Sequence, residues 1–124
     1  MATQTLWGQA QQSKKIAKGI MLYSTASHGG FHVSNTRQKD MLPFFKLEDG
    51  WYEEDCDWCL VILAFPEYFK PSEYVDAISC MKNWHPDRYE EWTGCKLTPE
   101  DSYIRRQQAI DNADKFLQRI GKES

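Results

Sequence analysis

The sequence predicts an α+β fold, in which a small antiparallel β-meander near the N-terminus packs with three to five helices and the last helix is long. Short stretches of strand-forming residues, separated by glycine-containing turns, occupy the chain up to residue 34. From residue 71 onward, apolar residues recur three and four positions apart between prolines and glycines, which is typical of helices. The 124 residues suffice for one hydrophobic core, so we expect a single globular domain over residues 1–124.

The N-terminal meander is expected to contain three strands. "LWGQAQQSKKIA" (residues 6–17) predicts the first, "IMLYSTA" (20–26) the second and "GFHVS" (30–34) the third, with a turn at Lys18-Gly19. Ser27-His28-Gly29-Gly30 connects the second strand to the third. We expect the paired glycines to supply the positive φ angles that a tight hairpin turn requires.

The middle of the chain begins with "SNTRQKDMLPFF" (34–45), which predicts a short helix with Ser34 or Asn35 as its N-cap, interrupted near Pro43. The segment after Gly50 allows two interpretations. As a helix over residues 51–65, it would place its acidic residues in the first turn, where the backbone dipole favours negative charge, and it would align Tyr52, Cys56, Cys59, Leu60 and Leu63. As a strand, "CLVILAF" would be buried and the acids would lie on the preceding loop. The acids and the stop at Pro66 favour the helix.

Three helices are expected in the rest of the chain. Residues 71–84 begin with Pro71-Ser72 and end before His85-Pro86, and residues 86–92 form a short helix that stops at Gly94. The last helix is predicted to begin with Thr98 as N-cap and to close at Gly121. Its apolar face is expected to pack on the domain or on another subunit, so a homodimer through this helix is left open; the face consists of Tyr103, Ile110, Ala113, Phe116, Leu117 and Ile120.

Several classes of protein are disfavoured by composition. No apolar run approaches the roughly 18 residues that span a bilayer, and residues 1–12 lack the pattern of a signal peptide, so we expect a cytoplasmic protein without membrane contact. A net charge of −3 argues against direct nucleic-acid binding. The four cysteines are expected to be reduced, and "CDWC" lacks the second pair that a zinc site requires, so no metal or cofactor is predicted.

The turn around His28 is the first candidate site. A histidine on a glycine-rich turn is exposed enough to act, and glycines let a ligand approach the backbone closely. The alternative is purely structural, because hairpins require glycine and an exposed histidine is usually only solvated. The candidate binding residues of this region are Ser27, His28, Gly29, Gly30 and His32.

The second candidate is "WYEEDCDW", residues 51–58. It crowds the carboxylates of Glu53, Glu54, Asp55 and Asp57, which is unfavourable without water, a metal ion or a basic partner. It could be an acidic helix start with a solvated face, a general acid or base facing His28, a divalent-metal site, or an interaction surface framed by Trp51, Tyr52 and Trp58. A catalytic pair of Cys56 and His28 is disfavoured, because neighbouring carboxylates raise the pKa of a thiol.

The chain also resembles a known family. "LWGQAQ", "STASHGGFHVS", "GWYEEDCDW" and "FPEYF" together look like a domain of unknown function found in bacterial and phage proteins, over roughly Trp7 to Phe69. The resemblance implies that the His-Gly-Gly turn and the acidic segment belong together, and it suggests a phage, plasmid or other mobile-element setting. Small proteins from such settings often bind host machinery, for example to inhibit defence nucleases.

The sequence therefore predicts a small cytoplasmic binding protein, acting as an accessory or anti-defence factor on a partner with a basic surface. The aromatic residues of segment 51–58 would anchor the partner and the carboxylates would pair with its arginines or lysines. The alternative is an enzyme or small-ligand binder in which His28 and Glu53, Glu54 or Asp55 converge on a pocket floored by the two glycines.

Overall fold

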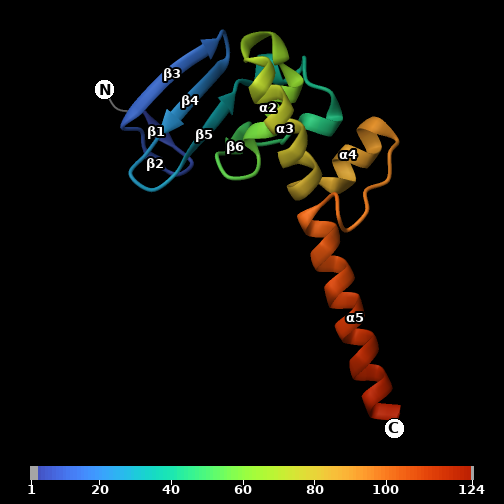
Figure 1. The fold of residues 1–124 in the computed structure, drawn as a ribbon. Coiled ribbons are helices and arrows are strands. Elements are labelled where there is room, and N and C mark those ends of the chain that lie inside the picture. Colours follow the sequence, from blue (N-terminus) through green and yellow to red (C-terminus); the bar gives the residue numbers. More distant parts are fainter. Residues whose placement is uncertain (1–2, 124) are drawn as a thin grey trace. The chain divides into compact units, whose positions relative to one another are not determined.

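A computed structural model gives the fold of residues 3–123 (Figure 1). The chain divides into two compact units, unit 1 ending at Ile78 and unit 2 beginning at Ser79. All described strands lie in unit 1, and unit 2 contains only helices and loops. The predicted α+β class, with an N-terminal antiparallel sheet and a long last helix, is confirmed.

Unit 1 is built around a four-stranded antiparallel sheet with the order β3-β4-β5-β6. Its strands are β3 (Gln12–Ala17), β4 (Ile20–Ser24), β5 (Gly29–Val33) and β6 (Trp51–Glu53). A separate two-stranded hairpin formed by β1 (Gln4–Thr5) and β2 (Gly8–Gln9) precedes the sheet.

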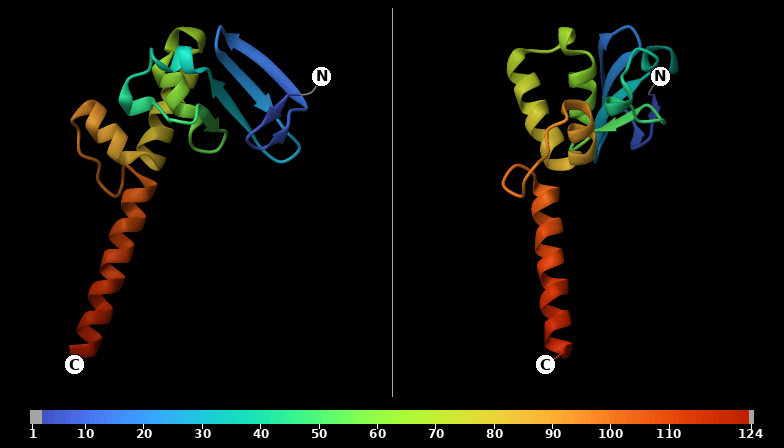
Figure 2. Two further views of the ribbon diagram at one scale, coloured as in Figure 1. Left: turned by 180° about the vertical axis from the view of Figure 1, so that it is seen from behind. Right: turned by 90° about the vertical axis from the view of Figure 1, so that its right-hand side faces the viewer.

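The register of the sheet separates an inner from an outer face, because residues opposite one another on neighbouring strands share a face. Phe31 lies opposite Tyr52, and Ile20 lies opposite Val33; all four side chains are buried on the inner face. Helix α2 (Trp58–Ala64) contacts β5 and β6, and the two views of Figure 2 show it beside the sheet. The core of unit 1 therefore lies between the inner face and α2.

Strand β3 forms one edge of the sheet. Lys14 and Lys15 are exposed on it, and its pairing with β4 shifts register between Lys15 and Ala17. Charged residues and a bulge are common features of unpaired sheet edges.

Unit 1 also contains short helical segments. Of the two N-caps predicted, Ser34 is the one that caps α1 (Asn35–Gln38), since its side chain accepts a hydrogen bond from the Arg37 backbone N–H over 3.2 Å. Two 3₁₀ turns follow at the prolines, η1 (Pro43–Phe45) and η2 (Pro66–Tyr68). The predicted helix over residues 71–84 is confirmed as α3 (Pro71–Trp84), whose first residues up to Ile78 belong to unit 1 and whose remaining residues belong to unit 2.

The predicted helix over residues 51–65 is wrong in its first half. Residues 51–53 form strand β6, a turn follows, and α2 begins only at Trp58. Acidic residues favour the first turn of a helix, but the backbone of residues 51–53 pairs with β5, a partner that local sequence cannot reveal. Tertiary pairing thus overrides the local preference.

Two expectations for the meander are also wrong. The predicted first strand, residues 6–17, is divided into the β1–β2 hairpin around Trp7 and strand β3. Gly29 and Gly30 do not form the turn but lie within β5, and Gly29 has no positive φ. Their missing side chains serve close packing, since a Cβ on Gly29 would lie 2.7 Å from the Tyr23 carbonyl oxygen.

Unit 2 contains α4 (Pro86–Thr93) and α5 (Tyr103–Glu123). Gly94 ends α4 in the left-handed conformation, with φ 74°, as its position predicted.

The start of α5 was predicted four residues too early, at Pro99. Thr98 and Asp101 form a turn of their own, because the Asp101 carboxylate accepts hydrogen bonds from the Thr98 N–H and hydroxyl. Ser102 precedes the helix and accepts from the Arg105 N–H. The helix also continues past Gly121.

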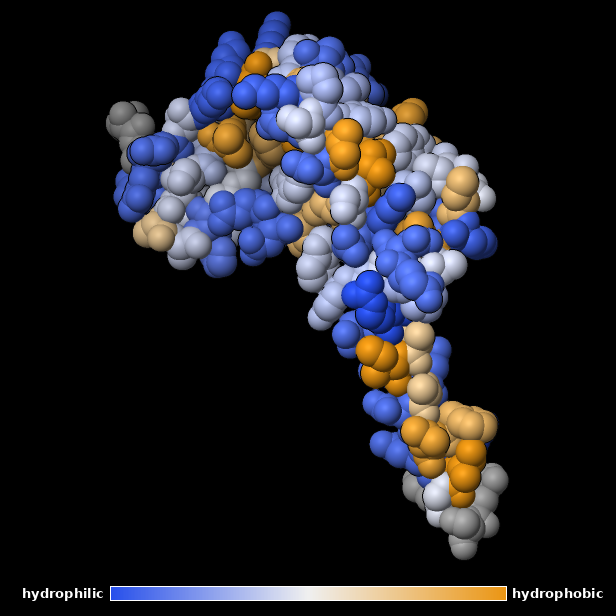
Figure 3. All heavy atoms as spheres, in the orientation of Figure 1, coloured by the Kyte–Doolittle hydropathy of each residue, from blue (hydrophilic) through white to orange (hydrophobic). Residues whose placement is uncertain are grey.

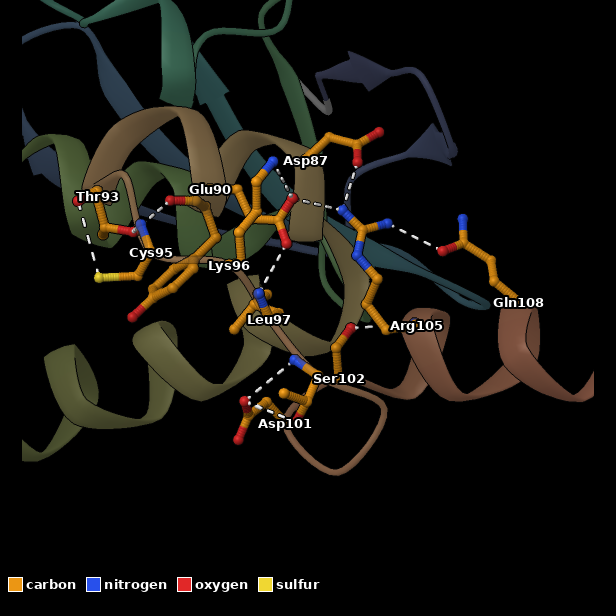
Figure 4. A network of polar contacts seen from close by, with 12 residues as sticks. Asp87, Glu90, Thr93, Cys95, Lys96, Leu97, Asp101, Ser102, Arg105 and Gln108 are labelled. Atoms are coloured by element: carbon orange, nitrogen blue, oxygen red, sulfur yellow. Dashed lines mark hydrogen bonds and ion pairs between the residues drawn. The ribbon is translucent and has the colours of Figure 1, made fainter.

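A polar network joins α4, the following loop and α5 (Figure 4). The Arg105 guanidinium contacts Asp87 at 2.7 Å and Glu90 at 2.8 Å, and it donates to Gln108 at 2.9 Å. Glu90 also accepts a hydrogen bond from the Leu97 N–H at 2.8 Å. The Leu97 N–H and the Arg105 guanidinium hold the pKa of the Glu90 carboxyl below its ordinary value. The ionised carboxylate therefore stabilises unit 2 above the ordinary glutamate pKa, and this contribution is lost as the pH falls through the lowered one.

The apolar face of α5 is exposed. Figure 3 shows hydrophobic side chains along this helix, and the exposed fraction is 46% for Ile110 and 63% for Leu117. Phe116 and Ile120 are exposed to similar extents. Between residues 3 and 123, no helix combines the length and the apolar character needed to cross a membrane.

Candidate functional site

Residues 54–57, here called the acidic turn, follow β6 and fold against the start of β5. The Glu54 N–H donates to the Gly29 carbonyl over 2.9 Å, and a Cβ on Gly29 would lie 3.0 Å from a Glu54 carboxylate oxygen. Glu53 supports the turn itself, because its carboxylate accepts from the Asp55 N–H at 3.0 Å. The acidic turn is thus held at the end of the sheet where β5 begins.

The turn around His28 lies immediately before β5 and is closed by Thr25. The Thr25 hydroxyl donates to the His28 carbonyl oxygen over 2.6 Å and accepts from the His28 N–H over 3.0 Å. Ser27 and His28 are exposed. Because Gly29 joins this turn to the acidic turn, the two predicted stretches are neighbours at one end of the sheet.

Four aromatic rings meet on the outer face and on the β1–β2 hairpin, and we call them the aromatic face. Trp51 is at the centre: its ring centroid lies 4.3 Å from that of His32, 5.4 Å from Trp7 and 6.0 Å from Tyr23. All four side chains are half-buried. Aromatic residues with partial exposure are typical anchors of binding surfaces.

Gly30 provides the space for Trp7 in this cluster. A Cβ on Gly30 would lie 2.7 Å from the indole atom Cη2 of Trp7, and the Tyr52 carbonyl would be closer still. Glu53 lies opposite Gly30 on the neighbouring strand, so the aromatic face ends beside the residue that supports the acidic turn. Neither Trp7 nor Tyr23 was predicted as a site residue. The alternation within residues 20–24 puts Tyr23 on the outer face of the sheet. The tight packing at Gly30 places Trp7 against that face.

His32 is the histidine integrated into the aromatic face. Burial lowers the pKa of its imidazole, and the Asp49 carboxylate opposes part of that effect. The neutral form is therefore favoured where the ring stacks on Trp51. Asp49 also accepts a hydrogen bond from the Trp51 N–H at 3.0 Å, which fixes the start of β6.

Three residues of the predicted acidic-aromatic surface have other positions. Tyr52 is fully buried, so it belongs to the core and cannot anchor a partner. Trp58 and Asp57 are half-buried at the start of α2.

Burial, followed by the charges of Asp57 and Glu53, raises the pKa of the Cys56 thiol to about 12. This thiol stays protonated near neutral pH, which disfavours a nucleophilic role.

Glu54 and Asp55 are the most accessible carboxylates of the region. Both are exposed, and neither forms an ion pair within the part of the chain that the structure describes. The His28 side chain likewise makes no hydrogen bond to Glu53, Glu54 or Asp55 among residues 3–123. Beside the His28 turn lies a groove of about 390 Å³, lined by residues 7–11 and 25–27.

The fold and this region define a small α+β protein with a half-exposed aromatic face bordered by an acidic turn. The family model of a domain of unknown function, DUF7007, matches residues 1–115, and the chain belongs to this family. No curated protein and no solved structure matches the chain.

Proposed function

We propose that this chain is a binding protein whose partner is a protein with a basic surface, and that the aromatic face and the acidic turn form its binding site. The observation that carries this proposal is the Glu54–Gly29 backbone hydrogen bond. This bond holds the acidic turn against strand β5. The same strand contributes His32 to the aromatic face, and its Gly30 leaves space for Trp7. Indole rings near the exposed carboxylates of Glu54 and Asp55 suit arginine and lysine side chains, which stack on the rings and pair with the acids.

The alternative, an enzyme or small-ligand binder using His28 with the carboxylates, has less support. His28 and the acidic turn are close in the fold, but the ring makes no hydrogen bond with Glu53, Glu54 or Asp55 among the described residues. The groove beside the turn is lined by Trp7 and Ser27 rather than by His28 and the acids. An open, mixed aromatic and acidic surface fits a protein partner better.

The biological setting of the proposal rests on the family resemblance. We propose a cytoplasmic accessory factor of a phage or mobile element, with inhibition of a host defence protein as the specific form of binding. Direct contact with nucleic acid is not part of the proposal, because the net charge is −3 and the exposed residues of the acidic turn would repel phosphates.

The proposal predicts that charge reversal in the acidic turn abolishes binding. We expect the wild-type chain, used as bait in a bacterial lysate, to capture a basic protein that the Glu54→Lys/Asp55→Lys variant captures at least about tenfold less. Both residues are exposed and carry no ion pair that folding would lose. Glu53 is left unchanged, because it supports the turn. Quantitative mass spectrometry of the captured proteins measures the effect.

The matched control is Glu48→Lys/Glu67→Lys, which changes the net charge equally at two exposed positions of unit 1 away from the acidic turn. This control should capture the same basic protein as the wild type. Equal capture by all three baits would refute the assignment of the site, and equal loss in both variants would show that only net charge matters.

We also propose that α5 pairs with α5 of a second copy of the chain. Ile110, Ala113, Leu117 and Ile120 follow the three-and-four spacing of a coiled-coil seam. In an antiparallel pair, Ile110 would face Ile120 and Ala113 would face Leu117, so small and large side chains alternate. The large apolar side chains of this stripe are 46% exposed at Ile110 and Ile120 and 63% exposed at Leu117, and a contiguous exposed apolar patch often marks an interaction site. Two such stripes fall short of a standard interface, so we expect a weak dimer.

The dimer should be visible in analytical ultracentrifugation as a sedimentation coefficient that rises with protein concentration. We expect Leu117→Glu to remove this dependence, because it places a charge in the centre of the seam. Gln118→Glu is the control, since it adds the same charge one position outside the stripe. A wild-type chain that remains monomeric at several hundred micromolar would exclude the pairing.

A further inference from the structure

A cavity of unit 1 lies at the opposite end of the sheet from the acidic turn. It has a volume of about 560 Å³ and is lined by Lys18, Gly19, Ser34, Thr36, Arg37 and Asp40. Gly19 precedes β4 and Ser34 follows β5, whereas the His28 turn joins the other ends of these two strands. The cavity is therefore separate from the binding site proposed above.

Arg37 is held rigidly in the wall of this cavity. Its Nε donates to the Lys18 carbonyl over 2.9 Å, and one Nη donates to the Tyr68 hydroxyl over 3.2 Å. The guanidinium carbon also lies 5.4 Å from the ring centre of Phe65 and 5.5 Å from that of Tyr68. A side chain fixed in this way loses little conformational entropy when it binds a ligand.

The other Nη of Arg37 is the part still available to a ligand. It lies 3.7 Å from the Asp40 carboxylate, which is too long for a strong hydrogen bond. Asp40 is 63% exposed in its side chain, so this ion pair is weak and is screened by solvent. An anion in the cavity can therefore compete with Asp40 for the guanidinium.

Two further donors line the same cavity. Among residues 3–123, the Lys18 ammonium and the Thr36 hydroxyl make no hydrogen bond or ion pair. The Lys18 backbone is nevertheless fixed, because its carbonyl accepts from Arg37. Ser34 also lines the cavity, and its hydroxyl oxygen accepts a hydrogen bond from the Arg37 N–H.

We propose that this cavity binds the phosphate group of a small phosphorylated compound. Lys18, Thr36 and Arg37 each offer a donor from a different position, and a phosphate group has three terminal oxygens to receive them, whereas a carboxylate has two. Two cationic side chains against one carboxylate leave the lining positive. The volume accommodates more than the phosphate, so the remainder of a small metabolite fits beside it.

Nuclear magnetic resonance titration of the full chain with inorganic phosphate, at constant ionic strength, tests the proposal. We expect saturable shifts of the backbone amides of residues 18, 19, 36 and 37, and clearly weaker binding of acetate. Lys18→Gln should weaken phosphate binding about fivefold, because one charge near the anion is lost. Asp40→Asn should strengthen it about fivefold, because a competing carboxylate is removed.

Lys14→Gln is the matched control, since it removes a lysine of similar exposure from β3 outside the cavity lining. It should leave phosphate affinity unchanged. If Lys18→Gln and Lys14→Gln behave alike, if Asp40→Asn has no effect, or if acetate binds as well as phosphate, the cavity takes an adventitious ion only and the proposal is overturned. The gain expected for Asp40→Asn cannot arise from a loss of folding.

Discussion

Replacing Gly30 by alanine is expected to lower the free energy of unfolding of unit 1 by about 3 kcal/mol. The added Cβ would lie 2.7 Å from Trp7 Cη2 and even closer to the Tyr52 carbonyl oxygen. The carbonyl belongs to the paired strand β6, so it cannot move without breaking the ladder between β5 and β6. Trp7 would also be expelled from its contact with Trp51. Urea denaturation followed by the amide resonances of unit 1 measures the change.

Gly121→Ala is the control for this substitution. A Cβ at Gly121 meets no atom within 4 Å, and the residue lies inside α5, where alanine is favoured over glycine by up to about 1 kcal/mol. It should be neutral or slightly stabilising for unit 2. A loss below about 1 kcal/mol for Gly30→Ala would mean that Trp7 is not seated on β5 as described.

Replacing Tyr52 by phenylalanine is expected to cost about 2 to 3 kcal/mol, although only one oxygen atom is removed. The Tyr52 hydroxyl is buried, donates to the Gln38 side-chain oxygen over 2.9 Å and accepts from the Leu47 N–H over 2.9 Å. Gln38 is itself 3% exposed, so its oxygen would lose a partner where water has poor access. The effect is measured by the same denaturation experiment.

Tyr23→Phe is the matched control, because Tyr23 is half-buried in the same sheet and its hydroxyl makes no hydrogen bond among the described residues. Its expected effect is within about 0.5 kcal/mol. If both variants lost a similar free energy of unfolding, the role assigned to the Tyr52 hydroxyl would be wrong. That role is to join β6 to Gln38 and Leu47.

Features that depend on a few adjacent residues could be predicted from the sequence. The Ser34 cap, the start of α3 at Pro71 and the end of α4 at Gly94 all follow from local hydrogen bonding and backbone geometry. The family resemblance, rather than any local pattern, also predicted that the His28 turn and segment 51–58 lie close together.

Features that depend on distant partners could not be predicted. The acids of segment 51–58 favour a helix start, but residues 51–53 pair with β5, which makes Tyr52 part of the core. The glycines of β5 resemble turn residues until Trp7 and the Tyr52 carbonyl are placed against them. The start of α5 was misplaced because Asp101 uses its carboxylate within the loop, and Ser102 is the residue next to the helix.

The edge of the sheet formed by β3 has a consequence for the behaviour of the chain at high concentration. A strand from another copy that approached β3 would have to place its backbone beside the ammonium groups of Lys14 and Lys15 and across the irregularity before Ala17. Both features disfavour the extension of one sheet into the next, which is the first step of fibril growth. Open-ended polymers that grow through β3 are thereby disfavoured.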